Sequence, residues 1–197
     1  VGVIGTRRVV EIRYDRAVSF GIRRCEFDDY LLRRSGARLL LGQPVSSIRR
    51  EGAGWIVNCT IETKLLVGAG GHFCPIARIL GTRAQHSPVI AAREVEFMIE
   101  SESATDDRRD GAAYNVAAEV PELYFCPDFK GYGWCFRKQN HLNVGFGRLD
   151  AQALPKQTDE FVEFLKATGR IPDAAGWRWR GHAYLLASDA GRNAIGD

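Results

Sequence analysis

A glycine cluster directly after an apolar run is the feature of this chain with the clearest chemical potential. The run covers residues 64–67, and a helix-like stretch follows over residues 75–80. The cluster between them consists of Gly68, Ala69, Gly70 and Gly71. A turn almost without side chains lets the backbone approach a phosphate or a flat ring closely. This order predicts a buried strand, a cofactor-holding turn and a helix start, with an ordinary strand-to-helix turn as the alternative.

Cysteine and histidine side chains offer few further reactive groups. Cys74 lies at the expected helix start, where the helix dipole lowers a thiol pKa, so it is a candidate catalytic residue, although most such cysteines are inert. The five cysteines form no CxxC pair, which favours reduced thiols in a cytoplasmic protein. The four histidines have no shared spacing and are interpreted as structural, so the sequence supports neither a catalytic triad nor a metal site.

Three aromatic residues alternate along one strand-like run, namely Tyr132, Trp134 and Phe136. Alternation with a period of two places all three on one face of a strand. Such a row can line a pocket for a small hydrophobic or aromatic substrate, or it can pack in a core. The sequence leaves both interpretations open.

The elements that must position these residues form an α/β (α+β) pattern. Helices are expected at residues 25–34, 75–80 and 158–168, with Gly36 and Gly169 ending the first and last of these. Strands are expected at residues 9–14, 37–41, 45–49, 55–60, 64–67, 89–99, 123–126, 132–137, 141–148 and 177–186. Residues 88–186 are therefore expected to form a mostly antiparallel sheet with the helix over 158–168.

Composition excludes several function classes. The chain has 45% hydrophobic residues, and its formal net charge of +3 is spread over arginine doublets with acidic residues between them. This spread argues against a nucleic-acid-binding stripe. No apolar run approaches the roughly 18 residues of a transmembrane segment, and the first residues do not resemble a signal peptide.

Three segments together resemble the para-hydroxybenzoate hydroxylase superfamily of FAD-dependent oxidoreductases. The glycine cluster is similar to its second FAD motif, Gly-Ala-Asp-Gly followed by Ser and Arg, with Arg78 at the Arg position. The stretch from Arg24 to Leu31 is similar to an Arg-x-x-Phe-Asp-x-x-Leu helix start whose arginine lies near FAD. Residues 131–136 and 141–147 resemble the Tyr-x-Trp-x-Phe strand pair of the geranylgeranyl reductase branch.

The chain departs from these patterns at three positions. Gly70 stands where the family has Asp, Cys74 where it has Ser, and Arg137 where the branch has Pro. The family's Asp is associated with flavin and nicotinamide binding, and the Pro with the prenyl-reductase branch. These departures count against NAD(P)H and a prenyl chain, but the resemblance as a whole still implies NAD(P)H as a candidate reductant and a prenyl chain as a candidate substrate.

The resemblance implies a cofactor, FAD, and a set of residues that contact it. The candidate cofactor-binding residues are Arg24, Val45, Gly68, Ala69, Gly70 and Gly71, and the candidate substrate-binding residues are Tyr132, Trp134 and Phe136. Arg24 has a surface charge as its alternative interpretation. The family's first and third FAD motifs have no clear counterpart, so we expect a central fragment that binds FAD weakly by itself.

The resemblance also implies a domain organisation and a reaction. Residues 1–87 would form part of a Rossmann-like FAD-binding domain, residues 88–186 a substrate-binding sheet covering the flavin ring, and residues 187–197 a return toward the first domain. The expected activity is reduction of an unsaturated, apolar, prenyl-like substrate, with peripheral membrane contact as a candidate interaction. Flavin-dependent hydroxylation of an aromatic or apolar substrate and a non-catalytic small-molecule binding module are the alternatives.

Overall fold

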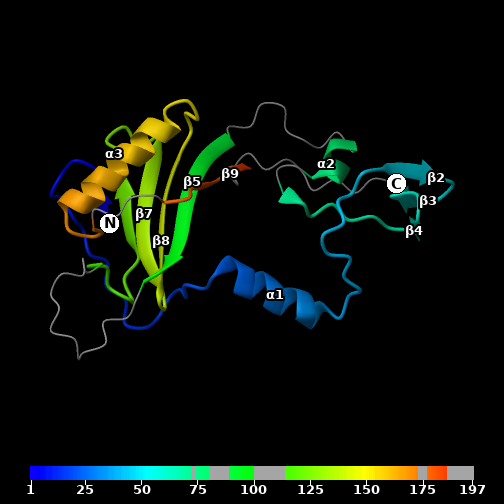
Figure 1. The fold of residues 1–197 in the computed structure, drawn as a ribbon, viewed down its shortest axis with the longest axis horizontal. Helices are drawn as coiled ribbons and strands as arrows, with labels where there is room; N and C mark the ends of the chain where they lie inside the picture. The colour runs from blue at the N-terminus through cyan, green and yellow to red at the C-terminus, as the bar shows by residue number, and fades with distance from the viewer. Residues whose placement is uncertain (72–73, 80–88, 100–113, 173–176, 186–197) are drawn as a thin grey trace. The chain divides into compact units, whose positions relative to one another are not determined.

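The chain forms two compact units, each built around its own sheet (Figure 1). The computed structural model describes residues 1–71, 74–79, 89–99, 114–172 and 177–185. The first unit comprises Val1–Asp28 and Ile90–Ala183, and the second comprises Asp29–Val89 and Tyr184–Asp197. Helices and mixed or antiparallel strands occur together, which confirms the predicted α/β class.

Three helices and nine strands are found in the described residues. Their bounds are β1 (Gly2–Val3), α1 (Arg24–Ser35), β2 (Ile48–Glu51), β3 (Gly54–Val57), β4 (Ile61–Thr63), α2 (Pro75–Ile79), β5 (Val89–Met98), β6 (Glu122–Phe125), β7 (Gly131–Lys138), β8 (His141–Arg148), α3 (Leu154–Ala167) and β9 (Arg180–Leu185).

The first unit contains a six-stranded sheet in the order β1-β6-β7-β8-β5-β9. Strands β6, β7, β8 and β5 pair antiparallel, and β1 pairs with β6 in parallel. The hairpin between β7 and β8 pairs Lys138 with His141, and Gln139 in its two-residue turn has a positive φ of 56°. The predicted mostly antiparallel sheet is therefore present, and its strands match the expected ranges closely.

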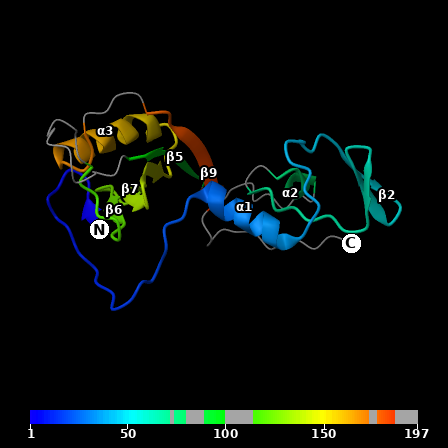
Figure 2. The same cartoon turned by 60° about the horizontal axis from the view of Figure 1, so that its bottom comes forward.

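Helix α3 covers one face of this sheet and closes the core (Figure 2). The core cluster has Phe161 and Leu165 from the helix and Leu142, Val144 and Phe146 from β8, all between 0% and 1% exposed. The Phe161 ring fits against β7 because Gly133 has no side chain, and a Cβ built there would lie 2.5 Å from ring atoms. Burial of this apolar face is the main stabilising term of the unit.

Helix α3 begins at Leu154 and not at Thr158, so the predicted helix over 158–168 starts four residues too late. Asp150 accepts hydrogen bonds from two backbone N–H groups in the turn before the helix, and a proline occupies the first turn, where its missing N–H costs nothing. Thr158 is fully buried and donates its hydroxyl proton to the Leu154 carbonyl. A threonine hydroxyl can cap the start of a helix or donate to a carbonyl one turn earlier inside it, and the Thr158 hydroxyl donates to such a carbonyl.

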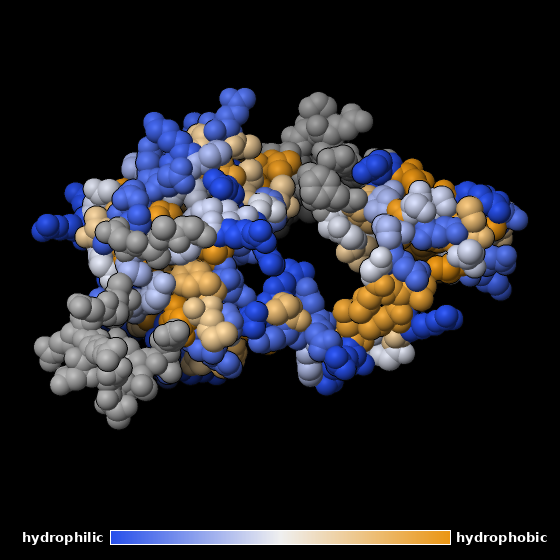
Figure 3. Space-filling view, in the orientation of Figure 1, coloured by the Kyte–Doolittle hydropathy of each residue, from blue (hydrophilic) through white to orange (hydrophobic). Residues whose placement is uncertain are grey.

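The second unit has a three-stranded antiparallel sheet, β2-β3-β4, and the short helix α2. Strand β2 begins three residues after the predicted start at Val45, and the sequence reading missed β4. Positive φ angles at Asn58 and Cys59, 51° and 57°, end β3 and turn the chain into β4. Apolar side chains gather on the surface between α1 and β2 (Figure 3), where Leu41 is 71% exposed.

Three predicted strands, over residues 9–14, 37–41 and 64–67, are wrong. Val9 makes an isolated bridge to Gly2, and Val10 bonds to Val1, but residues 11–14 continue without strand pairing. Leu65 and Val67 are 77% and 72% exposed, so the apolar run before the glycine cluster is not a buried strand. A strand needs a neighbouring backbone to complete its hydrogen bonds, and among the described residues no strand pairs with residues 11–14, 37–41 or 64–67.

Candidate functional site

The glycine turn before α2 folds back tightly on the start of that helix. A Cβ built at Gly68 would lie 2.9 Å from the Cys74 Sγ atom and 2.9 Å from the Ile76 Cβ atom, so only glycine fits there. Gly71 has a left-handed φ of +69° and nothing within 4 Å of its would-be Cβ. At Gly71 the turn therefore has bare backbone with no described atom packed at its would-be Cβ, and such a surface fits a phosphate or a flat ring.

Cys74 is held by the same turn. Its backbone N–H donates to the Gly71 carbonyl at 3.1 Å, and the residue is 5% exposed. Backbone hydrogen bonds from Ala77 and Gly70 lower the pKa of the Cys74 thiol, against burial, which raises it. The predicted candidates Gly68, Gly70 and Cys74 are thus brought together, while the buried thiol has little access to a substrate.

The other two cofactor candidates have exposed side chains. Arg24 begins α1, its side chain is 84% exposed, and its Nε atom contacts Asp28 at 2.7 Å one turn later on the same helix. Val45 is 48% exposed. Arg24 belongs to the first unit and the glycine turn to the second, so their cofactor roles stay predictions.

Two kinds of feature are absent from the described ranges. No three His, Cys, Asp or Glu side chains there are grouped so that they could hold a metal ion. No helix in the same ranges is both long and apolar enough to cross a lipid bilayer.

The predicted aromatic row lies on the sheet face opposite α3. Gly133 and Cys135 of β7 point to the α3 core, so the residues that alternate with them point the other way. The Tyr132 and Trp134 ring centroids are 5.7 Å apart, and Lys138 Nζ lies 5.6 Å from the Phe136 centroid. We call this surface the aromatic face; it consists of Tyr132, Trp134 and Phe136 on β7, Asn143, Gly145 and Gly147 on β8, and Ala92, Glu94 and Glu96 on β5.

The Trp134 indole packs directly against its cross-strand partner Gly145. A Cβ built at Gly145 would lie 2.1 Å from the indole, so only glycine leaves room for the ring at this position. The indole Nε1–H donates to the Asn143 side-chain oxygen at 2.6 Å. Trp134 is 9% exposed and Asn143 2% exposed, so this hydrogen bond is shielded from water.

Charged residues continue the network beyond Asn143. Its amide nitrogen lies 3.5 Å from a Glu94 oxygen and 3.4 Å from a Glu96 oxygen. Glu96 also accepts from Lys138 at 2.7 Å and from Arg23 at 3.2 Å. Burial raises the pKa of Glu96, but the hydrogen bonds from Lys138 and Arg23 outweigh it, and the net pKa lies below its ordinary value of 4.5.

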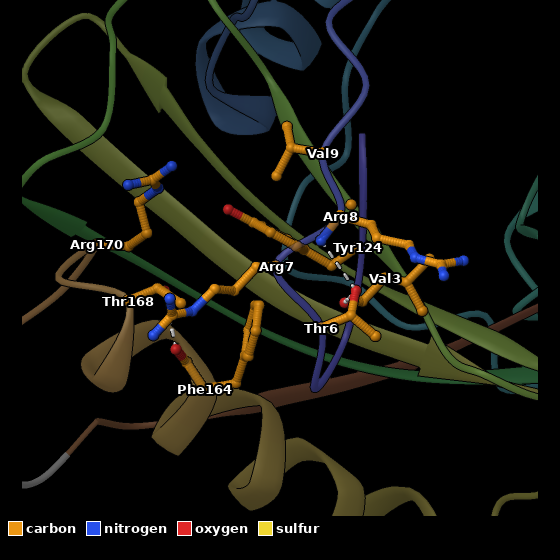
Figure 4. Close-up of a pocket in the computed structure, with 10 residues that line it drawn as sticks. Val3, Thr6, Arg7, Arg8, Val9, Tyr124, Phe164, Thr168 and Arg170 are labelled. Atoms are coloured by element: carbon orange, nitrogen blue, oxygen red, sulfur yellow. Dashed lines mark hydrogen bonds between the residues drawn. The ribbon is translucent and has the colours of Figure 1, made fainter.

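Two hollows of the first unit lie on the α3 side of the sheet. One, of about 80 Å³, is bordered by Tyr124, Phe164 and Arg170 together with the segment that follows β1 (Figure 4). Glu122 joins its polar groups, because it accepts from the Tyr124 hydroxyl and from Arg170 Nε. The second, of about 250 Å³, is lined by Cys126, Asp128 and Glu160 among others. Neither is lined by the predicted substrate residues.

The sequence reading missed Asn143, Gly145, Glu94 and Glu96. The signal for them was present, because polar or small residues alternate with apolar ones in 141–148 and 89–99. Alternation alone does not say which strands are neighbours. The pairing of Trp134 with Gly145 and of Phe136 with Asn143 appears only once the register of β7 and β8 is known.

Comparison with known proteins finds distant relatives. No family model matches the chain. The chain is 26% identical over 178 residues to the digeranylgeranylglycerophospholipid reductase of Methanocaldococcus jannaschii, and 25% identical over 181 residues to the protein of that name from Methanococcus vannielii. Each match covers 84% of this chain and 43% of the relative. The chain therefore spans less than half the length of the curated relatives it matches, and it is distantly similar to proteins named as prenyl-lipid reductases.

Proposed function

We propose that this chain is part of an FAD-dependent reductase that acts on an unsaturated, apolar, prenyl-like substrate. The observation that carries the proposal is the aromatic face, where Trp134 is fixed beside Tyr132 on the side of the sheet away from the α3 core. The half-buried rings of Tyr132 and Phe136, on either side of the buried Trp134 indole, form a suitable contact surface for an apolar chain. The names of the two relatives agree with this substrate class.

The cofactor part of the proposal depends on the glycine turn. Gly68, Ala69, Gly70 and Gly71 would hold FAD, since the turn has almost no side chains and Gly71 already has the left-handed conformation with nothing packed at its would-be Cβ. FAD, when bound, supplies hydride acceptance and donation, with NAD(P)H as the proposed reductant. Arg24 and Val45 remain further proposed contacts.

The chain's own residues would bind and orient the substrate. The rings of Tyr132, Trp134 and Phe136 would contact the apolar chain and exclude water from it. The Asn143 amide and the charged groups behind it hold the indole in place and are themselves satisfied by protein partners.

An absorbance spectrum tests the cofactor assignment. The complete gene product should be purified with a visible flavin band, and the 197-residue chain should retain less flavin through gel filtration. A complete gene product that stays colourless even after incubation with FAD would overturn the assignment and favour a non-catalytic binding module. Turnover that requires molecular oxygen would favour the hydroxylase alternative, because a reductase needs none.

A further inference from the structure

We infer that Asn143 is a positioning residue that fixes the Trp134 indole against Gly145 and thereby makes the aromatic face a rigid wall. This inference deepens the proposed function, because that function makes the face a substrate-binding surface. Asn143 would not touch the substrate. It would act through the indole, whose position decides the shape of the wall.

Chemistry fixes the orientation of the Asn143 amide. An indole N–H can only donate, so the amide oxygen must face Trp134, at 2.6 Å. The amide nitrogen then faces Glu94 and Glu96, which as carboxylates can only accept. The opposite orientation would place the nitrogen against the indole N–H and the oxygen against two carboxylates. The network therefore has one satisfied arrangement.

The charges behind Asn143 hold that arrangement in place. Glu96 lies between Lys138 Nζ at 2.7 Å and Arg23 Nε at 3.2 Å, and the Lys138 side chain is 13% exposed. The pairs keep Glu96 ionised and therefore an acceptor for the amide. Removing the amide would leave the buried indole N–H without a partner, an arrangement that proteins avoid.

Gly145 supplies the second constraint on the indole. The hydrogen bond restrains the Nε1 edge of the Trp134 indole. The missing side chain at Gly145 lets the ring approach the β8 backbone closely. A methyl group at this position would overlap the ring and push it outward into the space that a substrate would use. The position of the Trp134 indole is then restrained by the hydrogen bond along the sheet and by the contact with Gly145 perpendicular to it.

Two single substitutions and their double form the first test. Asn143→Leu removes the hydrogen bond while keeping a side chain of similar size, and Trp134→Phe removes the donor. The near-ultraviolet circular dichroism of Trp134 is obtained by subtracting the Trp134→Phe spectrum. Asn143→Leu should lose most of this signal, whereas the Trp134→Phe background should change little when Asn143→Leu is added. An unchanged Trp134 signal in folded Asn143→Leu protein would overturn the inference.

Ligand binding and a matched glycine pair form the second test, done on the complete gene product. Asn143→Leu should weaken binding of a geranylgeranyl lipid about tenfold and raise KM by a similar factor, with kcat nearly unchanged and flavin retained. Gly145→Ala should do the same, whereas Gly133→Ala, which displaces Phe161 on the α3 face, should lower the melting temperature. If Asn143→Leu and Gly133→Ala lower the melting temperature equally and Asn143→Leu leaves KM unchanged, then Asn143 is only structural.

The two tests separate the inference from the proposed function. A wild-type protein that binds no geranylgeranyl lipid would contradict the proposed function, and the dichroism result would still decide whether Asn143 positions Trp134. Conversely, lipid binding that is unaffected by Asn143→Leu would keep the function and contradict the positioning role.

Discussion

The two faces of the six-stranded sheet are built from alternate residues of the same strands, yet they are stabilised differently. On the α3 face, apolar side chains such as Phe146 and Phe161 exclude water and use no hydrogen bonds. On the aromatic face, Trp134 is held by a hydrogen bond to Asn143, which continues to charged groups. Burial on the first face stabilises the fold, whereas the hydrogen bonds on the second restrain the position of one ring. A shaped surface with satisfied polar groups is what a binding site needs.

A glycine on each face receives an aromatic ring. Gly133 accommodates Phe161 on one side of β7, and Gly145 accommodates Trp134 on the other side of the sheet. Both close approaches depend on a missing Cβ. The difference is that Phe161 belongs to the core cluster, and Trp134 is outside that cluster as it is defined among the described residues. The same device therefore serves packing on one face and positioning on the other.

Replacing one phenylalanine on each face of the sheet is the strongest test of the difference between the two faces. Phe161→Ala should lose about 3–5 kcal/mol of stability, because it opens a cavity in the core. Phe136→Ala, at a half-buried position of the aromatic face, should lose less than half of that free energy of unfolding. Chemical denaturation of both variants measures the difference, and equal losses would contradict the distinction between the faces.

Truncating the indole should affect binding more than folding. Trp134→Ala should remove on the order of 1–3 kcal/mol of contact with an apolar substrate while flavin content stays normal. Removal of a core tryptophan would instead cost about 3–5 kcal/mol of stability. Thermal unfolding and flavin content of the substrate-free complete gene product separate the two roles. Early unfolding together with flavin loss would show that Trp134 is a core residue.

Substitutions in the glycine turn test the cofactor part of the proposed function. Gly71→Val places a β-branched residue at a φ of +69°, which costs about 1–3 kcal/mol, and flavin binding should be abolished. Gly70→Asp should be tolerated, because a Cβ there meets Cys74 only at 3.4 Å, and use of a nicotinamide reductant should improve or stay unchanged. Flavin content after gel filtration is the measurement. Equal flavin loss in both variants would mean that a side chain at position 70 clashes with the cofactor and that the resemblance to the family's Asp fails at this position.

The smallest expected effect is the pH dependence of stability that comes from Glu96. The folded-state pKa of Glu96 is lowered by its hydrogen bonds with Lys138 and Arg23, so its contribution to stability is present above the ordinary value of 4.5 and is lost as the pH falls below it. Glu96→Gln removes this contribution. The stability difference between wild type and Glu96→Gln should therefore shrink as the pH falls from 6 to about 3. A difference that stays constant over this range would contradict the ionised network.

The sequence predicted the first unit better than the second. Period-two alternation located β5, β7 and β8, because long antiparallel strands with one core face have a clear pattern. The strands expected over 9–14 and 64–67 failed because an apolar run forms a strand only beside a partner backbone. At the site, the alternation of Trp134 with its neighbours was predictable. Its contacts with Asn143 and Gly145 depend on register, which alternation does not give.

Anaerobic reoxidation of the reduced complete gene product by a geranylgeranyl lipid tests the central claim most directly. The account predicts that the oxidised flavin band returns when the unsaturated lipid is added without oxygen. The fully saturated lipid should leave the band bleached, and Trp134→Ala should slow its return with the unsaturated one. A band that returns only with oxygen, or that returns equally fast in Trp134→Ala, would contradict the proposal of a prenyl-lipid reductase whose substrate lies on the aromatic face.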